Sequence, residues 1–488
     1  MKKIYTILAA AMLSIVMVST ATAAKEEKVE VKAEKADAKA AANEAKGGEY
    51  RRSSLCLMMI KTPTMPMAEM IEKSFLESPM PEKYNDHNVG KRVFALSDVK
   101  VEKEDNAVFQ EAISRGKSSE SKAANPDDGE AGEKKGGGFG KFMADASRAA
   151  ASEATGGLVS TEGASQVAAV AYKYLSDKNI GYHMMNKWFG GTVSNNLDLI
   201  GQRGLYDASV ARTQEAAGNY IGNYSLMDAG MELIPNSFAV VSIYEYLNKD
   251  QLVEQIGAIM MAGAELSGNE IAIMSAKAAV TAMKVSMGEG YYVKTRTFLF
   301  QLNCDEQILG TIDTELWDKP LKWAEHKDKF EFNYIGTETA WAKVKAGIFT
   351  NKSEEELIRI ATINAMDDVL AKLEKKYEIF KTKVPLMVEE VVDGKKTTQV
   401  LTANIGLKDG LSAGDKYEVL EGYYEEGSAR TKYKKIGTVK VSKDQIWDNR
   451  YMADVENTLQ GDAQGFTATR FDGGKAKFYS GCVLRQVK

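Results

Sequence analysis

The segment Ser237–Tyr246 reads SFAVVSIYEY and predicts a buried β-strand, because it is apolar, rich in β-branched and aromatic residues, and begins just after Pro235. Ser54–Ile60 (SLCLMMI) is a second short apolar run with the length of a buried strand. Helical patterns lie on both sides of these two runs. We therefore expect residues 49–384 to form a mixed α/β region.

Helices are predicted on either side of the strand at Ser237. Met67–Leu76 predicts a short helix, and helical character dominates from Lys141 to about Met231, including Ser165–Leu175. After the strand, Ser267 and Glu270 have the spacing of a capping box. An apolar stripe at three- and four-residue intervals follows them: Ile271, Met274, Ala278, Ala282 and Val285.

The clearest helix in the chain begins at the capping box Ser353-x-x-Glu356 and is closed by Pro385. Such a helix buries one face against a core when its apolar residues keep helical spacing. The residues with this spacing are Leu357, Ala361, Ala365, Val369, Leu373, Tyr377 and Phe380.

Two connecting segments also carry predictions. Tyr292–Leu302 is aromatic and β-branched, and Ile308–Leu316 alternates apolar with more polar residues, so the two predict a hairpin around a turn at residues 303–305. Residues 117–140 are rich in Ser, Gly, Lys and Glu. This composition predicts a flexible surface insertion.

The last hundred residues have a different character, with short strands separated by glycine-rich turns. This pattern predicts a small all-β barrel or sandwich over residues 385–488, after a domain boundary near residue 384. The fold class expected for the whole chain is therefore α+β and multidomain. The predicted C-terminal strands are Gln399–Ile405, Lys416–Leu420, Ile436–Val441, Gly465–Phe471 and Ser480–Val487.

One motif in this region is Asn404–Leu420, NIGLKDGLSAGDKYEVL. Its three glycines permit tight corners, and Asp409 and Asp415 favour turns. The motif resembles the C-terminal SH3-like module of the flagellar-assembly T protein type. The order of elements before it is similar to the α/β module of curli-export proteins, although the chain lacks their lipidated N-terminal cysteine. These resemblances imply an SH3-like barrel and a role in envelope assembly, and they carry over no catalytic residue.

The first 23 residues have the three parts of a secretory signal. Lys2 and Lys3 are followed by the apolar run Ile4–Val18 and by small residues that predict cleavage between Ala23 and Ala24. Residues 24–48, mostly Ala, Lys and Glu, are expected to be a charged spacer. We therefore expect an exported protein that is periplasmic, outer-membrane associated or exposed at the cell surface.

Composition and charge limit the classes of partner that the chain is expected to bind. The chain has 488 residues, 44% hydrophobic and 27% charged, as globular proteins do, and its formal net charge of −5 argues against binding nucleic acid. No run of about 18 uncharged apolar residues follows the signal, so no transmembrane helix is expected in the mature chain. Cys56, Cys304 and Cys482 are an odd set, with at most one disulfide of unknown pairing or three buried thiols.

Motifs for catalysis, cofactors and metals are not found. Gly136–Lys141 lacks the first glycine and the Ser or Thr of a phosphate-binding loop. His87, His183 and His326 have no metal-ligand spacing, and Asp367-Asp368 are adjacent carboxylates on a predicted helix. We therefore predict no catalytic, cofactor-binding or metal-binding residues, although a pair of distant carboxylates leaves no local signature.

The residues Trp447, Asp448, Arg450 and Tyr451 form the candidate partner-binding cluster. Trp, Arg and Tyr are the residue types that dominate binding hot spots. The alternative is a structural role, with the tryptophan packed against the barrel and the polar residues in a turn.

These observations predict an exported, non-enzymatic cell-envelope component with a structural, assembly or binding role. Its expected partners are envelope proteins or wall polymer, and the oligomeric state is left open between a monomer and an oligomer. Two alternatives stay open. The first is a glycan- or peptide-directed hydrolase, which a cleft with two carboxylates would favour. The second is a surface-exposed adhesin or antigen.

Overall fold

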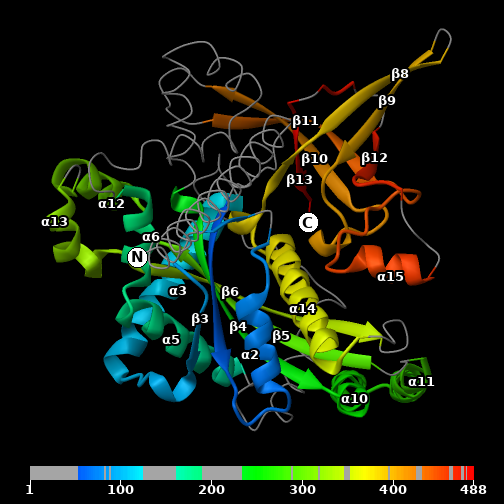
Figure 1. Ribbon diagram of the computed structural model, residues 1–488, viewed down its shortest axis with the longest axis horizontal. Coiled ribbons are helices and arrows are strands. Elements are labelled where there is room, and N and C mark those ends of the chain that lie inside the picture. The colour runs from blue at the N-terminus through cyan, green and yellow to red at the C-terminus, as the bar shows by residue number, and fades with distance from the viewer. Residues whose placement is uncertain are drawn as a thin grey trace, which may run out of the picture. The chain divides into compact units, whose positions relative to one another are not determined.

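A computed structural model describes the chain from residue 53 onward, with gaps (Figure 1). The predicted signal and spacer, residues 125–160 and residues 190–233 lie outside the described part. So do His87, Ser267 and the glycine-rich segment at residue 136. The described ranges are 53–81, 84–86, 89–124, 161–189, 234–266, 268–286, 290–316, 319–345, 352–393, 396–424, 431–460, 465–473, 477–479 and 481–487.

The first sheet, sheet A, has the strand order β2–β1–β4–β5–β6, and β3 also pairs with β1. β1 runs parallel to β2, β3 and β4, whereas β5 runs antiparallel to both of its neighbours, β4 and β6. The predicted strands at residues 54 and 237 are confirmed, and they pair with each other. The bounds are β1 Ser53–Lys61, β2 Tyr84–Asp86, β3 Arg92–Ala95, β4 Ser237–Leu247, β5 Gly290–Leu302 and β6 Phe332–Lys345.

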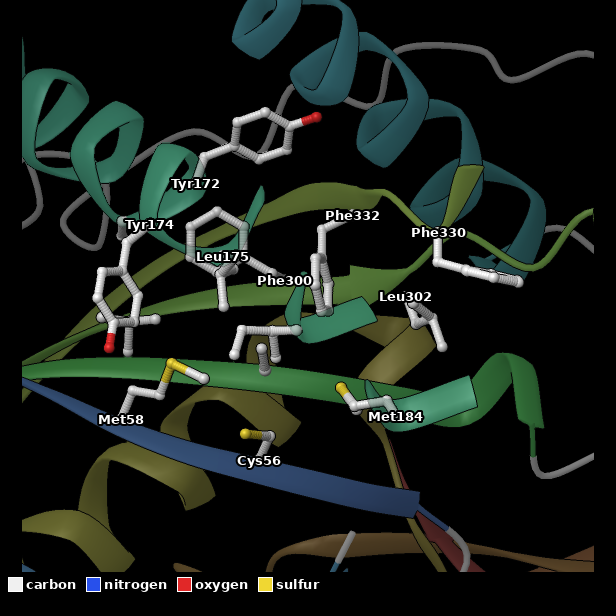
Figure 2. Close-up of a cluster of buried hydrophobic side chains, with 14 of the residues drawn as sticks. Cys56, Met58, Tyr172, Tyr174, Leu175, Met184, Phe300, Leu302, Phe330 and Phe332 are labelled. Carbon is white, nitrogen blue, oxygen red and sulfur yellow. The ribbon is translucent and has the colours of Figure 1, made fainter. Parts of the chain in front are cut away.

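Helices cover both faces of sheet A. One face packs against α3 (Lys103–Ala124), α5 (Thr161–Asp177) and α6 (Ile180–Phe189). Figure 2 shows part of this cluster, with Tyr174 and Leu175 of α5 directed toward the strands. The other face packs against α2 (Ala68–Glu77) and α14 (Glu354–Lys376).

The capping box predicted for α14 is confirmed. The Ser353 hydroxyl accepts a hydrogen bond from the Glu356 N–H at 3.2 Å, and the Glu356 carboxylate accepts one from the Ser353 N–H at 2.9 Å. Each bond satisfies a backbone donor that the first helical turn would leave unpaired. All seven residues of the predicted apolar stripe are buried.

The prediction of a second hairpin strand over Ile308–Leu316 is wrong. Residues after the turn form α12 (Glu306–Thr311) and a π-helical turn (Ile312–Leu316), and β5 pairs with β6 instead. Asp305 caps α12 by accepting a hydrogen bond from the Ile308 N–H at 2.9 Å. Ile308, Ile312 and Leu316 recur every four residues, so they share one helical face on the sheet A core.

The flexible insertion was predicted to begin at residue 117, but residues 117–124 are helical, because α3 continues through Ala124. Its Glu120 carboxylate accepts hydrogen bonds from the N–H groups of Glu378 and Ile379 at 2.6 and 3.0 Å. This tertiary contact stabilises a helical turn whose composition favours a loop.

The stripe predicted after Ser267 is not a core stripe throughout. It lies on α11 (Glu270–Ser286), which follows α10 (Lys249–Leu266). The side chains of Ile271 and Met274 are 74% and 72% exposed. The first turn of α11 therefore presents apolar residues away from the core.

The second sheet, sheet B, is a curled antiparallel half-barrel of seven strands in the order β7–β13–β10–β11–β12–β9–β8. The five strands predicted for this region are confirmed as β9 to β13, whereas β7 and β8 were not anticipated. Sheets A and B belong to one structural unit, Tyr50–Lys488. The bounds are β7 Lys383–Pro385, β8 Met387–Asp393, β9 Lys396–Ala403, β10 Lys416–Tyr424, β11 Thr431–Val441, β12 Thr469–Gly473 and β13 Val483–Gln486.

Short helices connect these elements. Those that matter for the site are the turn η6 inside the Asn404–Leu420 motif and α15 after the candidate cluster. The bounds of the short helices are η1 Leu96–Asp98, η2 Ile234–Asn236, α13 Pro320–Trp323, η4 Ala324–Lys329, η5 Glu378–Phe380, η6 Leu407–Asp409 and α15 Ala453–Gln460.

Candidate functional site

The candidate cluster lies in the connection between β11 and α15, where Trp447 and Asn449 hold the turn η6. The Trp447 carbonyl accepts a hydrogen bond from the Leu407 N–H at 2.9 Å. The Asn449 side chain accepts one from the Lys408 N–H and donates one to Asp409, both at 2.9 Å. The cluster therefore holds the glycine-rich motif in place.

Gly406 is required at this contact because no room exists for a side chain. A Cβ built on Gly406 would lie 2.2 Å from the Trp447 carbonyl oxygen and 2.6 Å from Asn449 Oδ1. The Gly406 N–H also donates to the Asp409 carboxylate at 2.8 Å. Both sides of the contact are thus fixed by hydrogen bonds.

Asp448 and Arg450 form a bidentate ion pair with each other. Arg450 Nε donates to Asp448 Oδ1 at 2.8 Å, and Arg450 Nη2 donates to Oδ2 at 2.7 Å. Burial opposes ionisation of Asp448, but the Arg450 hydrogen bonds and charge outweigh it and hold the pKa of that carboxyl below its usual range. Asn457 donates a further hydrogen bond to Asp448 at 3.3 Å.

Arg450 also faces two other acids. Its Nη2 lies 3.6 Å from Glu456 Oε2, and its charge acts on Asp368 of α14. Burial raises the pKa of Asp368, and the charges of Lys372 and Arg450 oppose that rise. Tyr451 packs against the sheet A core that contains α14. Asp448 and Arg450 of the candidate cluster therefore direct their charged groups toward partners within the chain.

A second group of carboxylates surrounds Tyr84 at the junction of α14 and η6. The Tyr84 hydroxyl donates a hydrogen bond to Glu374, and burial together with the charge of Glu374 raises the pKa of Tyr84 well above its usual value. Asp367 and Asp409 line an adjacent cavity of about 20 Å³. That volume suffices for one water molecule and is too small for a substrate. No sequence signal links Tyr84 to an acid 290 positions away.

The cysteines lie in two separate cores. Cys56 and Cys304 belong to the sheet A cluster, and Cys482 is buried in sheet B. The structure has no disulfide among these three described cysteines. Burial raises the pKa of the Cys304 thiol to about 12 and raises that of Cys482 as well. Neither thiol is therefore activated as a nucleophile.

The residue types that can ligate a metal are dispersed. His183 lies on α6. His326 lies on η4, with its Nε2 atom 3.2 Å from Glu315 Oε2. Across the ranges that the structure describes, no three His, Cys, Asp or Glu residues gather in a way that could hold a metal ion.

An open surface with binding chemistry is a groove on sheet B, here called the lysine groove, of about 600 Å³. Lys416 and Lys440 stand opposite each other on β10 and β11, and Asp472 follows on β12. Lys435 pairs with Glu418 at 2.9 Å. This groove was not predicted, and its available sequence signal was the alternation of Lys416 with Tyr417 and of Lys440 with Val439 and Val441. Its lining residues are Lys416, Lys435, Thr438, Lys440, Asp472, Gly473 and Val487.

Comparisons with known proteins add no family to this description. No protein-family model matches the chain, and no curated protein matches it significantly. Within the described ranges, no helix has both the length and the apolar character needed to span a bilayer.

Proposed function

We propose that the chain is an exported, non-enzymatic component of the cell envelope that binds or assembles with other envelope molecules. The observation that carries this proposal is the lysine groove, an open surface on the C-terminal sheet. Lys416 and Lys440 are adjacent there, and neither has an ion-pair partner among the described residues. Such a surface favours an acidic partner, either an envelope protein or an anionic wall polymer.

The finer architecture that we propose for residues 385–488 is an SH3-like barrel. Support comes from the curl of sheet B and from the Asn404–Leu420 motif, which the Trp447 and Asn449 contacts hold at the sheet's end. Loops and turns on a rigid sheet are common places for recognition. The signal at residues 1–23 supports a periplasmic, outer-membrane associated or surface location.

A hydrolase is less well supported. Glycan hydrolysis by paired carboxylates needs two acids on either side of an accessible cleft. Asp472 is the one carboxylate among the described lining residues of the lysine groove. The adjacent acids of α14 separate, because Asp367 lines the 20 Å³ cavity and Asp368 is next to Arg450.

The proposal is tested by crosslinking in the native cell, followed by fractionation and identification of the crosslinked partners. We compare the natural chain with Lys416→Glu/Lys440→Glu and with a matched control, Lys434→Glu/Lys443→Glu, at exposed lysines outside the groove lining. The expected result is a chain that begins at Ala24, occurs in the envelope fraction and loses its crosslinks by about tenfold in the groove variant alone.

Two results would contradict the proposal: a chain in the cytoplasmic fraction with its N-terminus intact, or a monomer with no enriched partner. Protease treatment of intact cells distinguishes a surface location from a periplasmic one, because the protease cleaves a surface-exposed adhesin and leaves a periplasmic chain whole.

A further inference from the structure

One part of sheet A carries a charged patch on the face whose apolar part packs against α3, α5 and α6. Along β5, alternate residues from Phe298 to Leu302 belong to the apolar cluster of that face, part of which Figure 2 shows. Toward the start of β5, the same alternation places Arg296, Lys294 and Tyr292 on this face. The register adds their neighbours on β4 and β6, and we call the set the arginine patch: Ile243, Glu245, Leu247, Tyr292, Lys294, Arg296, Thr339, Trp341 and Lys343.

Positive charges outnumber negative ones in the arginine patch. Its one carboxylate, Glu245, forms an ion pair with Lys294 at 3.2 Å, and both side chains are largely buried. The Lys294 ammonium also lies 5.1 Å from the centre of the Trp341 ring. Arg296 and Lys343 have no ion-pair partner in the described part of the chain. The patch therefore carries positive charge that its own carboxylate does not balance.

Arg296 is half-buried, and its guanidinium makes no hydrogen bond to a described residue. By contrast, the half-buried guanidinium groups of Arg115, Arg450 and Arg485 each donate to a carboxylate. A guanidinium has several N–H donors, and removing them from water without an acceptor is unfavourable. Burial lowers the pKa of Arg296, and the charge of Glu245 opposes that effect only in part. The site therefore has donors that need an acceptor.

Two hydroxyl groups lie near Arg296. Thr339 is its cross-strand neighbour on β6, and the Tyr334 hydroxyl on the same strand is close enough to be affected by the charge of Arg296. Both side chains are half-buried, and within the described ranges neither hydroxyl has a hydrogen-bond partner. Hydroxyl groups donate as readily as they accept, so they add donors beside the guanidinium.

We propose that Arg296 binds a compact anionic group, a carboxylate or a phosphate, of a ligand that occupies the arginine patch. A guanidinium donates two parallel hydrogen bonds to either group, and its planar shape matches both. The Thr339 hydroxyl is placed to donate to the same group, and Trp341 offers an aromatic surface next to it. A neutral or cationic ligand would leave Arg296 unpaired, so the patch selects for negative charge.

The test is a titration of the purified chain with inorganic phosphate and, separately, with acetate, at constant ionic strength held with sodium chloride. Binding to the folded chain raises the midpoint of thermal unfolding. We expect Arg296→Gln to raise the dissociation constant at least about tenfold, because charge-assisted hydrogen bonds are lost. Arg296→Lys keeps the charge without the planar fork, and we expect an intermediate loss.

Matched controls separate the patch from other cations of the chain. Arg359→Gln makes the same charge change at an arginine that pairs with Glu77 at 3.3 Å, and we expect it to keep the response to the anion. Lys416→Glu/Lys440→Glu removes the cations of the lysine groove and should keep it too. In chloride alone, we expect Arg296→Gln to unfold at the same temperature as the natural chain or above it, because an unpaired charge is removed.

The two titrations also distinguish the sources of the anion, because a response to phosphate alone assigns a phosphate and a response to acetate alone assigns a carboxylate. Three results would overturn the inference: no response to either anion, a response that both Arg296 variants retain in full, or an equal loss in Arg359→Gln. None of these results bears on the lysine groove, so the proposed function stands or falls separately.

Discussion

Replacing Gly406 with alanine tests whether the candidate cluster holds the turn η6. The Gly406 backbone has φ −154° and ψ −151°, outside the left-handed region, so alanine meets no penalty from a positive φ. Its methyl group would instead lie 2.2 Å from the Trp447 carbonyl oxygen. Since carbon and oxygen do not approach so closely, the turn and the cluster must move apart.

The cost of that movement follows from the contacts that break. The hydrogen bonds from Leu407 to the Trp447 carbonyl and from Lys408 to Asn449 are each 2.9 Å long and contribute about 1 kcal/mol. Overpacking adds about 1–3 kcal/mol. We therefore expect Gly406→Ala to destabilise this region by about 4 kcal/mol.

Hydrogen exchange at the Leu407 and Lys408 amides measures this loss directly. A change of about 4 kcal/mol corresponds to roughly a thousandfold faster exchange where opening is local. Gly465→Ala is the matched control, because nothing lies within 4 Å of a Cβ there, and we expect a change within about 0.5 kcal/mol. Equal exchange in both variants would refute the assigned role of the cluster.

Four further predictions concern other side chains. The pKa of Asp448 is lowered in the folded chain, so its contribution to stability is present above its ordinary pKa of 3.8 and is lost as the pH falls through the lowered value. Asp448→Asn should therefore cost about 1–2 kcal/mol at pH 7 in urea unfolding, and progressively less as the pH is lowered below 3.8. The pKa of Asp368 is raised, so Asp368→Asn should be neutral or stabilising at pH 7, and a clear loss would contradict the burial of that carboxyl. Cys304, with a pKa of about 12 against an ordinary 9.0, should react with iodoacetamide at pH 8 roughly a thousandfold more slowly in the folded chain than in urea. Glu120→Ala should lower the unfolding free energy by about 2 kcal/mol and expose the end of α3 to protease, whereas unchanged cleavage would show that the helix does not need this contact.

Local signals in the sequence were sufficient where one segment determines its own structure. The box at Ser353 and the stripe after it predicted α14, and the apolar runs at residues 54 and 237 predicted β1 and β4. Residues 308–316 were misassigned because a four-residue spacing satisfies both a strand period of two and a helix period near 3.6. Asp305, the helix cap, decides between them.

The site residues were harder to predict because distant segments build them. The lysine groove needs β10, β11 and β12 in register, and neither periodicity nor composition gives that register. The strand β8 escaped detection because Glu389 and Glu390 interrupt its apolar residues. The sequence singles out Trp447 and Arg450 as a candidate partner-binding cluster, but it does not reveal that Asp448 and Arg450 pair with each other inside the chain.

We propose above all that the sheet B groove binds a partner in the cell envelope. Its most direct measurement is photocrosslinking in native cells from an amino acid placed at Lys440, compared with the same amino acid at the exposed control position Lys434. We predict crosslinked products in the envelope fraction from position 440, and few from position 434. Equal yields from both positions, or products confined to the cytoplasm, would contradict the claim.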